Sequence, residues 1–207
     1  MENSFESAST RSQSRDNIAG DNREALRRQV FDAYEEAKRT GKLIGCYGVG
    51  PADSGRKKLF SEIPRIEGER IVLDRLVDSD ADALRELIDN PLVQRYLPTY
   101  LFEKQYGDAH EAIRLMYGDL FQNKESLILA IRLKETGELA GLAEFYGFND
   151  RLHKISVGGR LRECWWGHGL ATENVRLMVD YLYGETDIQI ITASTMIQNK
   201  ASAHSLE

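Results

Sequence analysis

The stretch from Val157 to Tyr183, VGGRLRECWWGHGLATENVRLMVDYLY, constrains the fold of this chain more than any other. It begins as a short apolar strand, in which Gly158-Gly159 would allow a bulge or a separation from a neighbouring strand. The next segment, Trp166–Ala171, carries glycine at alternate positions, and a helix follows with Gly184 as its expected C-terminal cap. Helical spacing predicts the apolar face of that helix from Ala171, Val175, Met178, Val179 and Leu182.

A glycine-spaced loop that runs into a helix is suited to bind an anion. Its N–H groups point outward without side chains in the way, and the helix start carries roughly half a positive charge. A phosphate or pyrophosphate is the natural ligand, although the same glycines would also serve to turn a tight corner. The loop lacks the Gly-Lys-Ser/Thr of a Walker phosphate loop and the third glycine of a dinucleotide-binding fingerprint.

The composition is typical of a globular protein with room for one domain and an extension. The chain has 207 residues, 42% of them hydrophobic and 29% charged. Its net charge of -6 argues against a dedicated nucleic-acid-binding protein. Cys46 and Cys164 lie far apart, so we expect reduced thiols and no metal site. Because residues 1–20 lack the apolar core of a signal peptide and no run is long enough to span a bilayer, we expect a cytoplasmic protein without a membrane partner.

The first third of the chain is less informative. Residues 1–20 are rich in serine and asparagine and are predicted to be disordered. A capping box of Asp21 and Glu24 predicts a helix that ends at Gly41. Residues 42–50 are compatible with a strand that its glycines weaken, or with a linker. We therefore divide the chain into a tail (1–20), an N-terminal extension of unknown role (21–64) and a domain (65–207).

From residue 65 onward the pattern becomes regular. Three helices are predicted in succession: one through Leu84 and Ile88 that breaks at Asn90-Pro91, a short one over 93–97, and a longer one over 109–120. Alternating or apolar runs predict strands over 70–76, 126–134, 139–148, around 155–157 and over 188–195, with the second and third joined in a hairpin. A final helix is expected to begin near Asn199. The order is that of a mixed α/β sheet with flanking helices.

Several segments resemble the GNAT superfamily of N-acetyltransferases. The run Trp166-Gly167-His168-Gly169-Leu170-Ala171 resembles the family's pyrophosphate loop, Q/R-x-x-G-x-G/A, with Trp166 at the first position. That tryptophan and the opening IEGERIVLDRLVDSDADAL are similar to the branch that acetylates ribosomal-protein N-termini. The resemblance implies a mixed, mostly antiparallel sheet that splays between its fourth and fifth strands.

The end of the chain resembles the family's second cofactor motif, N-x-x-S, at Asn199 and Ser202. The two final strands that the family fold would place after this helix are missing. We expect that the domain is truncated at its C-terminus, and the alternative is that the parent protein is shorter than its family. We expect such a domain to leave the edge of its last strand uncovered and prone to association.

The resemblance implies acetyl transfer from acetyl-CoA to a primary amine, with no metal. It assigns the pantetheine to backbone amides of a strand end, the pyrophosphate to the loop, and a hydrogen bond to the thiolate to Ser202. The implied cofactor-binding residues are Gly158, Gly159, Arg160, Leu161, Trp166, Gly167, His168, Gly169, Leu170, Ala171, Thr172 and Asn199.

The general base is harder to identify from the sequence. Glu144 and Tyr146 share one face of an apolar strand, and burial would raise the pKa of Glu144, but an ordinary surface glutamate fits the pattern too. His168 is expected to contribute through its backbone, and Glu173 only to favour the helix start. Without a clear base, an amine of low pKa such as a protein N-terminal α-amine is the easier substrate, and a small-molecule amine stays open.

Two other functions are compatible with the same residues. One is a module that binds CoA or another phosphate ligand without catalysis. The other is an inactive fragment that acts through its N-terminal segment. A homodimer is compatible with each of them.

Overall fold

The computed structural model describes residues 42–49, 56–97 and 102–206. The predicted tail over 1–20 and helix over 21–41 lie outside the described residues. The strands are β1 (Lys42–Val49), β2 (Ile66–Glu67), β3 (Ile71–Asp74), β4 (Ser126–Leu133), β5 (Leu139–Asn149), β6 (Lys154–Leu161) and β7 (Ile190–Met196). The helices are α2 (Ala81–Asp89), α3 (Pro91–Gln94), α4 (Ala109–Leu115, continued by a π-helical turn over Met116–Leu120), α5 (Leu170–Glu185) and α6 (Lys200–Leu206).

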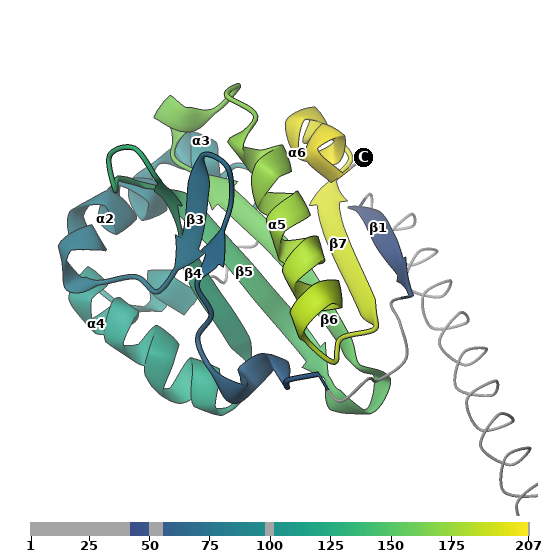
Figure 1. The fold of residues 1–207 in the computed structure, drawn as a ribbon. Helices are drawn as coiled ribbons and strands as arrows, with labels where there is room; N and C mark the ends of the chain where they lie inside the picture. Colours follow the sequence, from purple (N-terminus) through teal and green to yellow (C-terminus); the bar gives the residue numbers. More distant parts are fainter. Residues whose placement is uncertain (1–41, 50–55, 98–101, 207) are drawn as a thin grey trace, which may run out of the picture. The chain divides into compact units, whose positions relative to one another are not determined.

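All strands of the described residues join one seven-stranded sheet in the order β1-β7-β6-β5-β4-β3-β2 (Figure 1). Every neighbouring pair is antiparallel except β6 and β7, which are parallel. That parallel pairing covers only 154–156 against 190–192, although β6 continues to Leu161 and β7 to Met196. The two strands therefore separate, which confirms the predicted splay between the fourth and fifth strands of the family fold.

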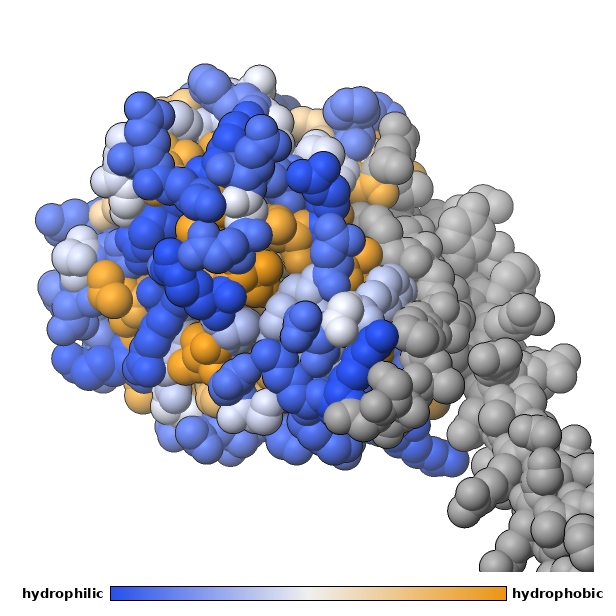
Figure 2. All heavy atoms as spheres, viewed as in Figure 1, coloured by the Kyte–Doolittle hydropathy of each residue, from blue (hydrophilic) through white to orange (hydrophobic). Residues whose placement is uncertain are grey.

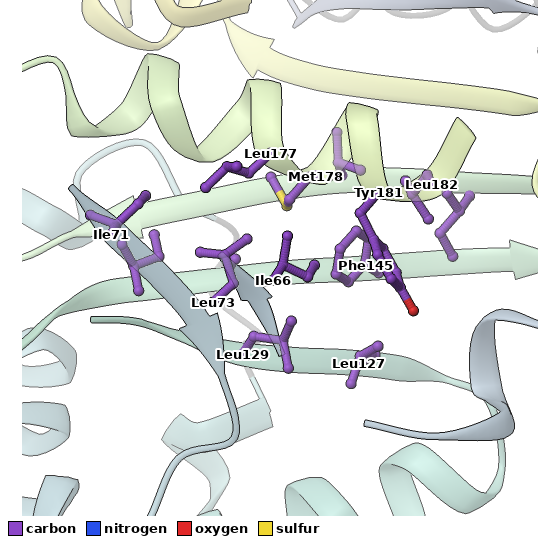
Figure 3. Close-up of a cluster of buried hydrophobic side chains, with 14 of the residues drawn as sticks. Ile66, Ile71, Leu73, Leu127, Leu129, Phe145, Leu177, Met178, Tyr181 and Leu182 are labelled. Atoms are coloured by element: carbon purple, nitrogen blue, oxygen red, sulfur yellow. The ribbon is translucent and has the colours of Figure 1, made fainter. Parts of the chain in front are cut away.

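The two faces of the sheet carry separate hydrophobic clusters. On one face α5 packs over β3 to β6, and its Leu177, Met178, Tyr181 and Leu182 point toward Ile71, Leu73, Leu129 and Phe145 (Figure 3). On the other face α2 and α4 pack against β4 and β5. In the view of Figure 1, apolar residues show at the centre of a largely hydrophilic surface, where α5 and β2–β3 lie side by side (Figure 2). Successive side chains of β5 point to opposite faces of the sheet, so this strand contributes to both hydrophobic clusters.

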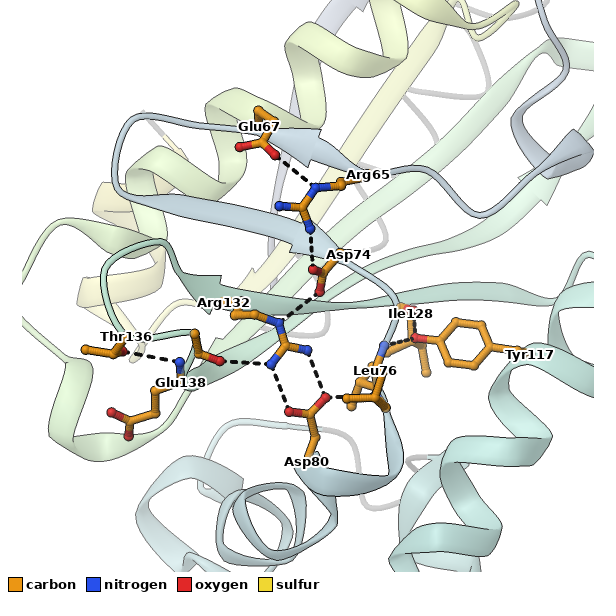
Figure 4. A network of polar contacts seen from close by, with 12 residues as sticks. Arg65, Glu67, Asp74, Leu76, Asp80, Tyr117, Ile128, Arg132, Thr136 and Glu138 are labelled. Atoms are coloured by element: carbon orange, nitrogen blue, oxygen red, sulfur yellow. Dashed lines mark hydrogen bonds and ion pairs between the residues drawn. The ribbon is translucent and has the colours of Figure 1, made fainter.

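A polar network fixes β4 to the start of α2. Arg132 donates from both terminal nitrogens to Asp80 at 2.9 Å and from Nε to Asp74 at 3.2 Å (Figure 4). Beside it, the Tyr117 hydroxyl accepts from the Leu76 N–H and donates to a β4 carbonyl. Burial raises the pKa of Tyr117, and the hydrogen bond from Leu76 opposes that rise. These contacts hold the helical layer on the sheet face opposite α5.

Several helix boundaries differ from the prediction. Gly184 is not a C-terminal cap, because α5 continues to Glu185 and Thr186 caps it by donating from its N–H to the Leu182 carbonyl. The short helix predicted over 93–97 is α3, which begins at Pro91, since Asn90 accepts from the N–H groups of Leu92 and Val93 as its N-cap and proline fits the first turn.

The buried face of α5 is also rotated from the predicted one. It consists of Leu170, Glu173, Asn174, Leu177, Met178, Tyr181 and Leu182. Ala171, Val175 and Val179 are only half-buried. The prediction missed this because a buried asparagine and glutamate sit on the face that meets the sheet.

The edge of β7 is covered, and our expectation of an uncovered edge is wrong. β1 pairs antiparallel along β7, from Lys42 opposite Met196 to Val49 opposite Ile190. The compact unit accordingly begins at Lys42, inside the segment that we assigned to an N-terminal extension. β1, which comes early in the sequence, thus occupies the position beside β7 at which we expected a strand that follows α6.

Candidate active site

The glycine loop leads directly into α5. Gly167 and Gly169 both adopt φ of +75°, a left-handed conformation in which other residues are strained. Gly169 is the N-cap of α5. Among the hydrogen bonds of the described residues, none is donated by the N–H of Gly167, His168 or Gly169. The first N–H groups of α5, at Leu170, Ala171 and Thr172, have no acceptor within the helix by construction. The loop therefore presents a row of free donors at a positive helix end.

Trp166 precedes this row and is half exposed. Its Nε1 donates to the Leu161 carbonyl at 2.9 Å, which ties the loop to the end of β6. The indole therefore has a structural contact of its own at the position where the family motif carries glutamine or arginine.

The end of β6 is the second part of the site. Gly158 to Leu161 pair with β5 on one side, while the side toward β7 lies beyond the last parallel pair at Ser156. A Cβ on Gly159 would lie 2.8 Å from Asn174 Nδ2, so only glycine lets α5 approach the strand here. The Oδ1 of Asn174 is buried without a hydrogen-bond partner among the described residues. The strand end thus has backbone groups free for a ligand, next to a polar atom that still lacks a partner.

Glu144 and Tyr146 share the other face of the sheet, as predicted from the alternation of their strand. Glu144 accepts from Ser126 Oγ at 2.8 Å and lies 3.4 Å from Arg160 Nη1. Arg160 also pairs with Glu103, whose side chain is 1% exposed. Glu144 is 21% exposed, so it is neither buried nor an ordinary surface glutamate. Two carboxylates and one guanidinium therefore form a cluster with a net negative charge.

Tyr146 lies beside this cluster, near the point where β6 and β7 separate. A Cβ on Gly158 would lie 3.3 Å from the Tyr146 ring, so the ring packs across that glycine. Burial raises the pKa of Tyr146, its hydrogen bond with Ser194 of β7 lowers it, and the Glu144 charge raises it again, with a net rise. Tyr146 therefore keeps its proton at neutral pH.

Asn199 and Ser202 lie at the start of α6. Asn199 Oδ1 accepts from the Ser202 N–H at 3.2 Å, and the Ser202 carbonyl accepts from Ser205 Oγ. α6 contacts α5 and β7, and Figure 1 places it at the end of the sheet where α5 begins. The structure thus gathers the loop, α6 and the separating ends of β6 and β7 at one end of the sheet, with Glu144 and Tyr146 on the face opposite α5.

Three features of the site were missed from the sequence. The side chain of Arg160 was not considered, although alternation along β6 places it on the same face as Gly158. Glu103 gave no signal, because it comes from a short 3₁₀ turn far away in the chain. Glu173 does more than favour the helix start, since it accepts from the N–H groups of Arg70 and Ile71 and from Arg70 Nε.

The environment of Glu173 also sets its protonation. Burial by itself would raise the pKa of this carboxyl, but the hydrogen bonds from Arg70 and Ile71 outweigh it and leave the pKa lowered. Glu173 is therefore an ionised link between α5 and β3.

The chain matches the family model of the acetyltransferase (GNAT) domain over residues 70–207. It is 26% identical to the uncharacterized N-acetyltransferase YoaA of Bacillus subtilis (strain 168), over 67% of this chain and 77% of that protein. It is 28% identical to the uncharacterized N-acetyltransferase p20 of Bacillus licheniformis, over 65% of this chain and 74% of that protein.

Solved structures agree on the fold. A GNAT acetyltransferase from Bacillus anthracis superposes with a TM-score of 0.59 at 19% identity, over 69% of this chain and 80% of that one. RimJ of Mycobacterium smegmatis in complex with CoA-disulfide gives 0.59 at 18% identity, over 69% and 73%. The ribosomal L7/L12 α-N-protein acetyltransferase RimL in complex with CoA gives 0.58 at 18% identity, over 69% and 80%.

No helix in the described part of the chain is both long and apolar enough to cross a membrane. The match to the family model covers well over half of the sequence and includes the glycine loop, the separating strands and α6. The chain belongs to the GNAT acetyltransferase family and is an acyl-CoA-dependent acetyltransferase.

Proposed function

We propose that the chain transfers the acetyl group of acetyl-CoA directly to a primary amine, and that its preferred acceptor is an α-amine such as a protein N-terminus. The observation that carries this proposal is the row of unpartnered N–H groups at Gly167–Gly169, beside the separated ends of β6 and β7. When bound, acetyl-CoA supplies an activated acetyl thioester. The residues fit such a ligand, because the free amides of the loop would donate to its pyrophosphate and the free edge of β6 would pair with the amide groups of its pantetheine arm.

The binding roles follow from the free donors. The N–H groups of 167–172 hold the pyrophosphate, and the backbone of Gly158–Leu161 holds the pantetheine. Asn199 uses Oδ1 to cap α6, which leaves its Nδ2 hydrogens to donate to the pantetheine. These contacts orient the thioester at the point where the sheet opens.

The proton-transfer roles follow from the charged cluster and from the pKa of Tyr146. Glu144 takes a proton from the incoming ammonium, either directly or through a water molecule. Ser202 Oγ donates a hydrogen bond to the sulfur as negative charge develops there. Tyr146 is a donor and not a base, because its raised pKa keeps the hydroxyl protonated.

The preference for an α-amine rests on proton arithmetic. An α-amine has a pKa of about 7.7–8.0, so roughly a tenth of it is neutral at pH 7, whereas a lysine side chain near 10.4 is neutral about once in a few thousand molecules. Glu144 already accepts a hydrogen bond from Ser126 and pairs with Arg160, and we propose that the acceptor is the amine that is easier to deprotonate. The net negative charge of the Glu103–Arg160–Glu144 cluster attracts the cationic form of either amine.

The test is release of CoA thiol with two kinds of peptide. One peptide has a free N-terminus and no lysine, and the other has a blocked N-terminus and one lysine. We expect turnover of the first to exceed that of the second by at least about tenfold, following the neutral fractions. Faster turnover of the lysine peptide would contradict the α-amine preference. Binding of CoA without thiol release from any amine in a broad panel would instead support a binding module.

A further inference from the structure

Arg70, the residue before β3, contacts the glycine loop from a distant part of the chain. Its Nη1 donates to the His168 carbonyl at 2.7 Å. Its Nε donates to Glu173 Oε2 at 2.8 Å, and its backbone N–H donates to Glu173 Oε1 at 2.8 Å. Glu173 is buried, whereas the Arg70 side chain is 49% exposed. The guanidinium is therefore fixed by a carboxylate of α5 and in turn holds one carbonyl of the loop.

That contact determines the direction of the next N–H group. A trans peptide is planar, so the carbonyl of His168 and the N–H of Gly169 point to opposite sides of the same peptide. With the carbonyl turned toward Arg70, the Gly169 N–H points away from Arg70. The 166–167 peptide is held in a similar way, because the Trp166 carbonyl lies 2.8 Å from His168 Nδ1.

The loop needs such restraint because glycines flank His168 on both sides. Glycine populates positive and negative φ about equally, so the 168–169 peptide can rotate at Gly169 at little cost. A rotated 168–169 peptide would present a carbonyl oxygen to an anion in place of an N–H donor. The hydrogen bond from Arg70 to the His168 carbonyl disfavours that rotated conformation in the unliganded protein.

We propose that Arg70 is a positioning residue of the pyrophosphate site: anchored by Glu173, it holds the His168 carbonyl so that the Gly169 N–H faces the phosphate. This inference rests on the proposed function of the loop. In this arrangement Arg70 lies on the side of the loop that faces away from the phosphate. The alternative arrangement is a direct ion pair between the guanidinium and a phosphate.

The two arrangements predict opposite effects of a second substitution. Glu173→Gln keeps an oxygen for the N–H groups of Arg70 and Ile71, but it turns an NH₂ group toward Arg70 Nε and releases the guanidinium. If Arg70 acts by positioning, CoA binding weakens. If Arg70 contacts phosphate directly, binding tightens, because the substitution removes a competing negative charge beside the guanidinium.

The experiment measures CoA affinity by calorimetry, together with steady-state kinetics, for the parent chain, Arg70→Gln, Glu173→Gln and the control Arg65→Gln. Arg65 also forms exposed ion pairs, with Glu67 and Asp74, and makes no contact with the loop. We expect both Arg70→Gln and Glu173→Gln to raise the Kd of CoA about tenfold, the loss of one charge-assisted contact. The KM for acetyl-CoA should rise with an unchanged kcat, and Arg65→Gln should match the parent.

Acetyl-pantetheine, which lacks the pyrophosphate, completes the design. Its kcat/KM should stay within about twofold of the parent in both loop variants, assayed at a temperature at which circular dichroism shows each variant to be fully folded. Equal loss with acetyl-pantetheine and acetyl-CoA, an unchanged Kd in Arg70→Gln, or tighter binding in Glu173→Gln would each overturn the inference. A parent chain that does not bind CoA would instead refute the proposed function of the loop.

Discussion

Replacing Gly141 with alanine should destabilise the fold at the strand that carries the proposed pantetheine site. Gly141 lies on β5 opposite Leu161 of β6. A Cβ at this position would lie 2.2 Å from the Arg160 carbonyl oxygen and 2.9 Å from Leu161 Cα. Both are backbone atoms of the neighbouring strand, so no side-chain rotation relieves the clash. The end of β6 must move away from β5.

The size of the effect follows from the kind of clash. Overpacking a core costs about 1–3 kcal/mol and occasionally more, and contact with backbone places this substitution at the upper end, about 3 kcal/mol. For a domain of this size, about 2–4 °C of thermal midpoint per kcal/mol gives a loss of about 6–12 °C. Because β6 moves, the KM for acetyl-CoA should rise as well.

Gly184→Ala is the matched control, because the same atom is added where nothing lies within 4 Å. Gly184 is in the last turn of α5, and alanine is favoured over glycine in a helix by about 0.5–1 kcal/mol. The free energy of unfolding, measured by urea titration, should therefore fall in Gly141→Ala and rise in Gly184→Ala. A Gly141→Ala protein as stable as the parent would refute the close approach of β5 and β6.

Three further outcomes are expected. Gly169→Asp should abolish measurable CoA binding in calorimetry while the fold survives, since it adds negative charge and strain at a φ of +75°; unchanged affinity would reject the loop as the pyrophosphate site. Ser202→Ala should lower kcat by up to about 10²–10⁴-fold with little change in CoA affinity, and a rate within twofold of the parent would reduce Ser202 to a structural residue of α6. Glu173 has a lowered pKa in the folded state, so the stability it contributes is present above its unfolded pKa of about 4.3 and is lost as the pH falls through the folded pKa. Glu173→Gln should therefore reduce the loss of unfolding free energy with falling pH at the acid end of the range. An unchanged acid dependence would show that other carboxyls determine it.

The fold and the loop could be predicted from the sequence because their signals are local. The spacing of Leu84 and Ile88, the hairpin between β4 and β5, and the glycines before α5 each depend on neighbours within a few residues. The family motif then fixed how these pieces assemble. The position of Glu144 on the face opposite Phe145 followed from alternation alone.

The missed features depend on contacts between distant segments. Arg70 reaches His168, and Glu103 reaches Arg160, across stretches of chain that carry no shared periodicity. The pairing of β1 with β7 is similar, because nothing in the residues of either strand predicts which strand it pairs with. Such contacts are set by the assembled sheet, so a single sequence gives the residues without giving their partners.

The pairing of β1 with β7 also has a consequence for how the chain is made. Among the described strands, β1 is the first to leave the ribosome during synthesis, whereas its partner β7 is the last. The β4–β5 hairpin can form as soon as both strands have been synthesised, but β1 has no strand to pair with until β7 has been synthesised. Its docking should be a late folding step, and in pulsed hydrogen exchange the amides of 42–46 should gain protection after those of the hairpin.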